Sequence, residues 1–324
     1  MPPEFTDELG DTPASPAGAA GRDVMSSSLG GQWDVLLNEA NVLELDRPAF
    51  RIGEGPWQGP LEIAGIDRQV RDALGAPPRG ESEPRPRAAR RIARRPRSVH
   101  LAMRFTFHVR AMPSGSLSLA IEHPQRFRIM LNGWRISTDA ASGCWRTPVQ
   151  QTLPLDPSLL CTGSNELAME CDYDKSCRLD TLRLLGNFGV ASEAAAAAMV
   201  ARPAALEFGD IAGQGLPFYG GSVTYWRRID LGVKLKAGQR VIVRVPAFEG
   251  RQVRVFGGGL PAGVIDRQSG EVDVTHRVQA DKLDLRLELL TTRPTAPDLT
   301  VSARSASAPA GLMAPPQLIV RQGV

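Results

Sequence analysis

The sequence predicts an all-β protein built from two antiparallel jelly-roll β-sandwiches in tandem. Apolar and polar residues alternate with a period of two over many short runs, which is typical of strands with one buried face. The chain contains 32 glycines and 26 prolines, which suits short strands joined by turns. Its 324 residues, 42% of them hydrophobic, are enough to form two buried cores.

The first sandwich is expected over residues 31–190. Residues 1–30 are rich in Pro, Ala, Gly, Ser and Asp and show almost no apolar periodicity, so they predict a disordered leader. Strands are expected at Trp33–Leu37 and Asn41–Asp46. Apolar residues at helical spacing over Ile66–Leu74, followed by a glycine, predict one short helix.

A basic insertion interrupts this sandwich at residues 79–98. Its seven arginines lie among prolines and alanines at Arg85, Arg87, Arg90, Arg91, Arg94, Arg95 and Arg97. On a helix, five of them would share one face and could contact phosphates. No aromatic residues interleave for base stacking, and the net charge of the chain is only +3. We therefore expect an exposed loop rather than a nucleic-acid site.

Alternation is most regular after the insertion. One alternating run ends in Asn132-Gly133, a dipeptide that favours a tight hairpin because both residues tolerate positive φ. The predicted strands lie at Val99–Val109, Leu117–Ile121, Phe127–Leu131, Val149–Leu153, Asn165–Cys171 and Leu179–Leu185. Short strands and turns in this order are typical of an antiparallel sandwich.

The second sandwich is expected over residues 191–324. Ser192–Arg202 is alanine-rich, so a short helix and an extended passage between domains both stay open. Four glycines and a proline in Gly213–Gly221 exclude a regular element there, and Ser222–Leu231 then alternates as a strand. Further strands are predicted at Arg240–Val245, Val253–Phe256, Glu271–Thr275 and Leu283–Leu289.

The loop and strand Gly213–Tyr225 read Gly-Gln-Gly-Leu-Pro-Phe-Tyr-Gly-Gly-Ser-Val-Thr-Tyr. Other marked runs are Leu119–Gly133, Gly143–Trp145, Gly163–Leu167, Leu184–Val190 and Ala310–Val320. Together they resemble the jelly-roll, galactose-binding-domain-like regions of large bacterial glycoside hydrolases of the family-two-like and α-L-rhamnosidase-like groups. The resemblance covers about residues 33–320. It implies a non-catalytic accessory region that holds glycan or supports a catalytic barrel domain or chain.

Three departures from that family pattern concern polar loops. Asn187 stands where an aspartate is expected, Phe256–Gly259 replaces a usual Val-Asn-Gly, and residues 291–297 differ from the family segment. Glycosidases need two carboxylates that converge on one bond, and no acid here, Glu122 included, lies in a motif that fixes such a pair. The resemblance implies that catalytic acids lie on a barrel domain. Enzymatic activity therefore stays open, and by resemblance it would be hydrolysis of O-glycosyl bonds.

Carbohydrate recognition is the chemistry that the residues favour. Pyranose rings pack their C–H faces on flat aromatic side chains, while their hydroxyls bond to polar groups. Trp134 follows the Asn-Gly turn, Trp145 follows a glycine, and Tyr219 lies in the glycine-rich loop; loops are where binding residues concentrate. We predict carbohydrate contacts at these three residues. The alternatives are internal packing of the rings and a structural or interaction module without a ligand.

No cofactor is predicted, with Ca²⁺ at Asp172 and Asp174 as the alternative. The four cysteines, Cys144, Cys161, Cys171 and Cys177, form no Cys-x-x-Cys pair, which argues against zinc. Free thiols are expected, and a Cys171–Cys177 disulfide is the alternative in an oxidising compartment. No run of 18 apolar residues predicts a membrane span. The N-terminal residues lack a secretory pattern, so a cytoplasmic location is the default expectation.

Overall fold

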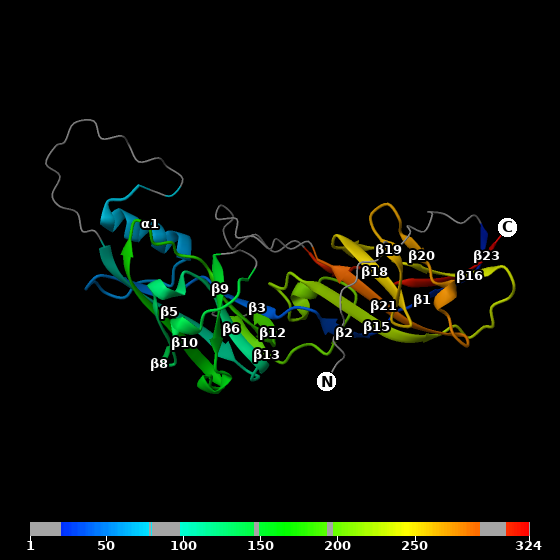
Figure 1. Cartoon of the computed structure of the whole chain (residues 1–324), viewed down its shortest axis with the longest axis horizontal. Coiled ribbons are helices and arrows are strands. Elements are labelled where there is room, and N and C mark those ends of the chain that lie inside the picture. The colour runs from blue at the N-terminus through cyan, green and yellow to red at the C-terminus, as the bar shows by residue number, and fades with distance from the viewer. Residues whose placement is uncertain are drawn as a thin grey trace, which may run out of the picture.

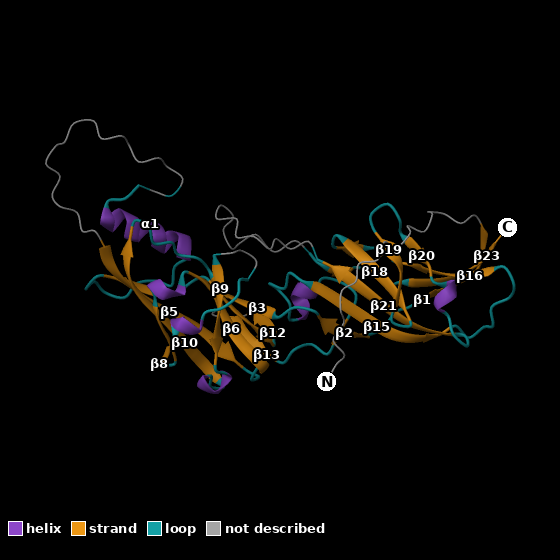
Figure 2. Cartoon of the chain, viewed as in Figure 1, coloured by secondary structure: helices purple, strands orange, loops and turns teal. Residues whose placement is uncertain are grey.

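The structure, a computed structural model, describes residues 21–77, 79, 98–145, 149–192, 197–291 and 309–323. Most of these residues lie in strands, and the buried side chains form two large clusters. Figure 1 shows the two corresponding bodies beside each other along the long axis of the molecule, with α1 at the outer end of the first body. Figure 2 shows how few residues are helical. The prediction of an all-β protein with antiparallel β-sandwiches is confirmed.

The first body consists of two sheets around one core. Sheet I has the order β12 (Gly189–Ser192), β13 (Ala197–Val200), β5 (Ser98–Val109), β10 (Gly163–Asp174), β7 (Arg128–Leu131) and β8 (Trp134–Ile136), and β4 (Ala49–Ile52) also pairs with β5. Sheet II has the order β3 (Asn41–Leu45), β11 (Leu182–Asn187), β6 (Ser114–Glu122) and β9 (Gln150–Leu155). In sheet I, β13 pairs with β5 in parallel, while the other pairs of the two sheets are antiparallel.

Helix α1 (Ile63–Leu74) packs its apolar stripe into the first core. The helix begins three residues before the predicted Ile66 because Ile63 belongs to the same buried face. It ends at Gly75, whose φ of 61° is left-handed, a conformation that favours glycine. The alanine-rich segment left open by the sequence is extended where it is described, since Ala198 and Met199 lie buried in β13.

The second body also has two sheets. Sheet III has the order β14 (Ala205–Leu206), β2 (Trp33–Leu37), β15 (Ser222–Asp230), β21 (Lys282–Leu290), β18 (Gln252–Gly257) and β19 (Leu260–Ile265). Sheet IV has the order β1 (Gly21–Ser28), β23 (Gln317–Gly323), β16 (Gln239–Arg244) and β20 (Glu271–Asp273). A short pair joins β17 (Phe248–Glu249) to β22 (Gly311–Leu312). Five short 3₁₀ turns complete the described elements at Pro124–Arg126, Thr138–Ala140, Pro157–Leu159, Ile211–Gln214 and Thr275–Arg277.

The N-terminal strands differ from the sequence-based expectation. Residues 21–28, expected within the disordered leader, form β1 and pair with β23. Strand β2, expected in the sandwich over 31–190, pairs with β15 and β14 instead. The reason is Trp33: its side chain is buried in the second core, where its indole Nε1 donates to Leu29 O at 3.0 Å. The chain of the second body therefore begins before the first body and continues after it.

Two expected features lie outside the described residues. The first is the basic insertion at 79–98, of which only Arg79 and Ser98 are described. The second is the segment 291–297 that differs from the family pattern, of which only residue 291 is described. Arg79 itself binds the carboxylate of Asp67 through two hydrogen bonds of 2.8 and 2.9 Å. Among the helices that the structure describes, none is long and apolar enough to cross a membrane.

Candidate functional site

Trp134 lies on β8, at the edge of sheet I, directly after the predicted Asn-Gly turn. The hairpin forms as expected, with φ of 52° at Asn132 and 83° at Gly133. The Asn132 amide donates to Leu159 O and to Asn165 Oδ1, both at 2.8 Å, and its oxygen accepts from Glu166 N at 2.9 Å. Three hydrogen bonds thus hold the turn, while the Trp134 side chain is 66% exposed. An exposed aromatic ring thus follows a turn that hydrogen bonds hold in place.

Trp145 is half-buried on the outer face of sheet II. Its ring packs against Val42, Ala120 and Leu185, and the guanidinium carbon of Arg183 lies 5.6 Å from the ring centroid. Internal contacts therefore already occupy much of this ring, in line with the packing alternative.

Arg183 is in turn held by two carboxylates. It donates to Glu44 Oε1 at 3.0 Å and to Asp180 Oδ2 at 3.2 Å. Because this ion-pair network fixes the guanidinium over Trp145, a sugar could stack on that face of the ring only after displacing it.

Tyr219 is fully buried. Its hydroxyl lies 2.7 Å from Ser222 O and 2.8 Å from Glu39 Oε2, and Glu39 Oε2 also accepts from Ser222 N at 2.8 Å. Burial, followed by the neighbouring Glu39 carboxylate, raises the pKa of Tyr219 above its usual range. In this structure Tyr219 ties the glycine-rich loop to Glu39 and offers no exposed face to a ligand.

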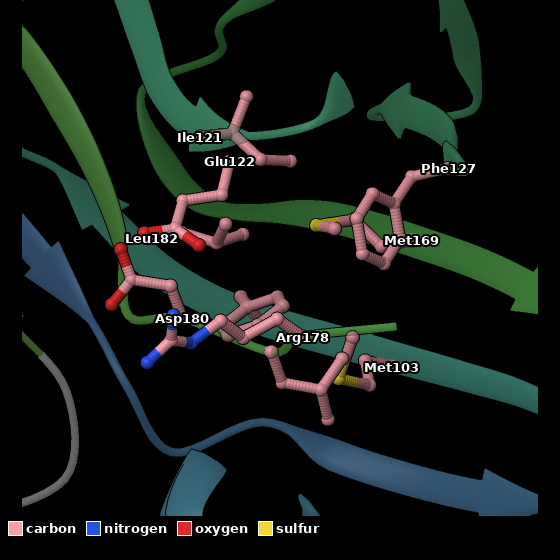
Figure 3. Close-up of a pocket in the computed structure, with 10 residues that line it drawn as sticks. Met103, Ile121, Glu122, Phe127, Met169, Arg178, Asp180 and Leu182 are labelled. Atoms are coloured by element: carbon pink, nitrogen blue, oxygen red, sulfur yellow. The ribbon is translucent and has the colours of Figure 1, made fainter. Parts of the chain in front are cut away.

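A buried pair of acids was not anticipated from the sequence. Glu122 ends β6, is 7% exposed, and lines a small cavity together with Asp180 and Arg178. Figure 3 shows the Glu122 and Asp180 carboxylates on the same side of the cavity, facing apolar side chains that include Met103, Phe127 and Met169. Burial, followed by the negative charge of Asp180, raises the pKa of Glu122.

Gln150 is a cross-strand neighbour of Glu122 and a hydrogen-bond partner of Asp180. It lies directly across from Glu122 in the β6–β9 register, and its amide nitrogen donates to Asp180 Oδ2 at 2.8 Å. Its amide oxygen is buried without a hydrogen-bond partner. The cavity has a volume of about 10 Å³, which is room for about one water molecule. A glycosidase must place a sugar between its two carboxylates, and this space is too small for a sugar ring.

The acids proposed as the alternative calcium ligands have other partners. Asp174 Oδ1 accepts from Ser176 N and Cys177 N and closes a turn. The exposed Asp172 carboxylate lies 3.5 Å from His100 Nδ1. Within the described parts of the chain, no group of three or more His, Cys, Asp or Glu side chains is placed to hold a metal ion.

Comparisons with known proteins give structural similarity without a family assignment. No family model matches the sequence, and no curated protein matches it. Among solved structures, a rhamnosidase from Novosphingobium sp. PP1Y is 15% identical with a TM-score of 0.31, over 69% of this chain and 23% of its own. A β-D-mannosidase from Dictyoglomus thermophilum is 12% identical (TM-score 0.28; 78% of this chain, 31% of its own). A putative β-galactosidase from Bacteroides fragilis is 11% identical (0.27; 78% and 36%).

The chain thus spans about a quarter to a third of the length of these proteins. The similarity is partial and at low identity. At these identities and TM-scores, it assigns no activity, substrate or site to this chain.

Proposed function

We propose that this chain is a non-catalytic β-sandwich module that binds carbohydrate and accompanies a glycoside hydrolase. The observation that supports this best is the exposed indole of Trp134, 66% accessible on a turn that Asn132 holds in place. A flat ring on an ordered backbone loses less conformational freedom than one on a disordered loop when a pyranose stacks on it. The sequence runs that resemble accessory regions of glycoside hydrolases support the same role.

The buried acids support a non-catalytic role. Glu122 and Asp180 come together, but they enclose space for about one water molecule and face apolar side chains. Asp180 also accepts hydrogen bonds from Arg183 and Gln150. The two carboxylates therefore have no room for a substrate between them.

Titration calorimetry with a panel of neutral oligosaccharides tests the proposal. We expect weak, enthalpy-driven binding to at least one saccharide, and Trp134→Ala should reduce it about tenfold, the scale of an aromatic contact. Trp134→Phe should retain part of the affinity because a ring remains. Arg135→Ala, at the neighbouring exposed position of β8, is the matched control and should bind as the parent does.

Since Trp134 is exposed, none of these variants should change the thermal unfolding midpoint. Equal affinity of Trp134→Ala and the parent would move the site away from β8. Absence of binding to every saccharide tested would overturn the proposal of carbohydrate recognition. The remaining hypothesis would be a structural or docking module, which the internal contacts of Trp145 and Tyr219 favour.

A further inference from the structure

The outer face of sheet III carries exposed apolar side chains. Along β2, β15, β21 and β18, alternate residues point into the second core, and the residues between them point away from it. Three large side chains on this outer face are about half exposed: Leu36 at 52%, Trp226 at 49% and Val264 at 46%. Leu36 and Trp226 lie on the neighbouring strands β2 and β15, while Val264 lies farther across the sheet on β19. Exposed apolar side chains that are neighbours on one sheet face can mark a contact surface.

One cross-strand row on this face combines aromatic rings with charges. The register places Asp34 beside Trp226, Trp226 beside Arg286, and Arg286 beside Phe256. These four residues lie on β2, β15, β21 and β18, which are consecutive in the sheet and close together in the second body of Figure 1. Since neighbouring strands are about 4.8 Å apart, Trp226 and Phe256 lie about 10 Å apart along the row.

The charges of this row differ from the others on the face. The Arg228 guanidinium binds both oxygens of Asp284, at 2.6 and 3.0 Å, and Arg254 lies 3.8 Å from Glu288. Among the described residues, no ion pair involves Asp34 or Arg286. Arg286 instead lies over the Phe256 ring, 5.8 Å from its centroid. In the part of the chain that the structure describes, the row therefore presents one guanidinium without an ion-pair partner between two aromatic rings, flanked along β21 by Asp284 and Glu288. Beyond Trp226 it presents one carboxylate without an ion-pair partner.

We propose that this row, Asp34–Trp226–Arg286–Phe256, binds a saccharide that carries carboxylate groups, that is, a chain of uronic acid units. The Trp226 ring would stack on the apolar face of one pyranose. The Arg286 guanidinium, with its donors in a planar fork, would bind the carboxylate of the neighbouring unit through two parallel hydrogen bonds. The Asp34 carboxylate would accept hydrogen bonds from ring hydroxyls.

The shape of the surface fits this ligand class. A sheet face is open along the row, so it admits an extended chain rather than a single enclosed sugar. A neutral saccharide would leave Arg286 without an anionic partner, and the charge complementarity therefore selects the acidic one. This row lies in the second body, whereas Trp134 lies in the first. The proposal for the row therefore does not depend on the proposed function at β8.

Calorimetry with oligogalacturonate and with its methyl ester tests the proposal, because esterification removes the charge and keeps the ring. We expect oligogalacturonate to bind more tightly than the ester, and the difference to shrink as salt rises, since the contact is solvent-exposed. Trp226→Ala should weaken binding of both about tenfold. Arg286→Gln should weaken binding of the acid about tenfold and leave the ester unchanged.

Two controls separate this site from the others. Arg228→Gln removes a guanidinium that already has a carboxylate partner and should leave the acid's affinity nearly unchanged. Trp134→Ala should also leave unchanged the binding of an oligogalacturonate that is too short to reach both surfaces. Circular dichroism melts of every variant establish that it is folded, which is expected because the substituted side chains are exposed.

Several outcomes would overturn the proposal. These are absent binding of oligogalacturonate, equal affinity for acid and ester, or parent-like affinity in Trp226→Ala. Loss of acid binding in Trp134→Ala alone would overturn this site while leaving the proposed function in place. Sedimentation equilibrium identifies the competing occupant: a dimer that Trp226→Ala dissociates, without saccharide binding, would assign the face to a second copy of the chain.

Discussion

Replacing Trp33 by alanine should destabilise the second body and leave the first nearly intact. The Trp33 side chain is 1% exposed, packs in the second core, and meets the ring of Phe208 edge-on at 6.2 Å. Truncating a buried tryptophan to alanine costs about 3–5 kcal/mol, since transfer and cavity costs add. The lost hydrogen bond from Nε1 to Leu29 O contributes about 1 kcal/mol of that total. Trp33→Phe keeps most of the ring and should cost about 1–2 kcal/mol.

Hydrogen exchange followed by mass spectrometry locates the effect, because each body has its own core. Peptides from β15 and β21 should exchange about 10²- to 10⁴-fold faster in Trp33→Ala than in the parent. This factor corresponds to a loss of about 3–5 kcal/mol when their amides exchange through opening of the whole second body. Peptides from β5 and β10 should be unchanged.

Leu119→Ala is the matched control in the other core. Leu119 is fully buried in the first body, so its truncation should cost about 2–5 kcal/mol there and give the opposite pattern of exchange. Faster exchange of β5 and β10 in Trp33→Ala would contradict the placement of Trp33 in the second core, because that result is expected if residues 31–190 formed one sandwich that includes Trp33. Unchanged exchange in both bodies would contradict it as well.

Three further results are expected. Tyr219→Phe should cost about 1–2 kcal/mol, because the buried hydroxyl contacts are lost, and should leave saccharide affinity unchanged; lower affinity with normal stability would restore Tyr219 as a ligand contact. The raised pKa of Glu122 means that the folded state holds the proton more tightly than the unfolded chain, whose value is 4.5. The stability that this group contributes is therefore present below about pH 4.5 and lost as the pH rises through the pKa of the folded state. The free energy of unfolding in urea should accordingly decline less above pH 4.5 in Glu122→Gln than in the parent. An equal decline in both proteins would contradict a raised pKa at Glu122. Ellman's reagent should find two fast thiols, those of exposed Cys144 and Cys161, with the two buried cysteines reacting only on unfolding; a mass 2 Da low would reveal a disulfide instead.

Local patterns in the sequence predicted elements well where one face of a strand is buried. Strand β15 forms as expected, with Val223 and Tyr225 buried in the second core and Trp226 exposed on the other face, although Ser222 and Thr224 on that other face are buried as well. The Asn-Gly hairpin at residue 132 also forms as predicted, because the positive φ of a tight turn is a property of two neighbouring residues. Periodicity and turn chemistry act over a few residues, so a single sequence carries them in full.

Pairing over long separations could not be predicted in this way. Strand β1 is exposed over nearly all its length, so it lacks an apolar period; hydrogen bonds to β23, near the other end of the chain, hold it in place. Strand β2, which carries Trp33, was assigned to the nearest sandwich in sequence, although its partner strands are β14 and β15. A strand's own residues do not say which sheet it joins when two cores are available.

The candidate sites show the same limit. All three predicted aromatic contacts lie in or beside turns, but Tyr219 is buried against Glu39, 180 residues earlier. Glu122 and Asp180 lie 58 residues apart in sequence and meet through the pairing around β6. Trp226 was expected on the face opposite Tyr225, and only the register with Asp34 and Arg286 shows that it belongs to a charged row. Exposure and neighbours, which decide whether an aromatic residue binds or packs, are set by tertiary contacts.

The separation of the two cores has a consequence for the two proposed surfaces. Trp134 belongs to sheet I and Trp226 to sheet III, so one ring can be removed without disturbing the packing behind the other. Each surface is open, and each alone should bind weakly because few contacts are desolvated. A polysaccharide long enough to reach both would convert the second contact into an intramolecular one, with an effective concentration in the millimolar range for a short flexible connection. Two weak sites on separate cores therefore favour long polysaccharides over short oligosaccharides. We expect affinity to rise with chain length in the parent and this rise to disappear in Trp134→Ala and in Trp226→Ala. A single site acting alone would not give that pattern.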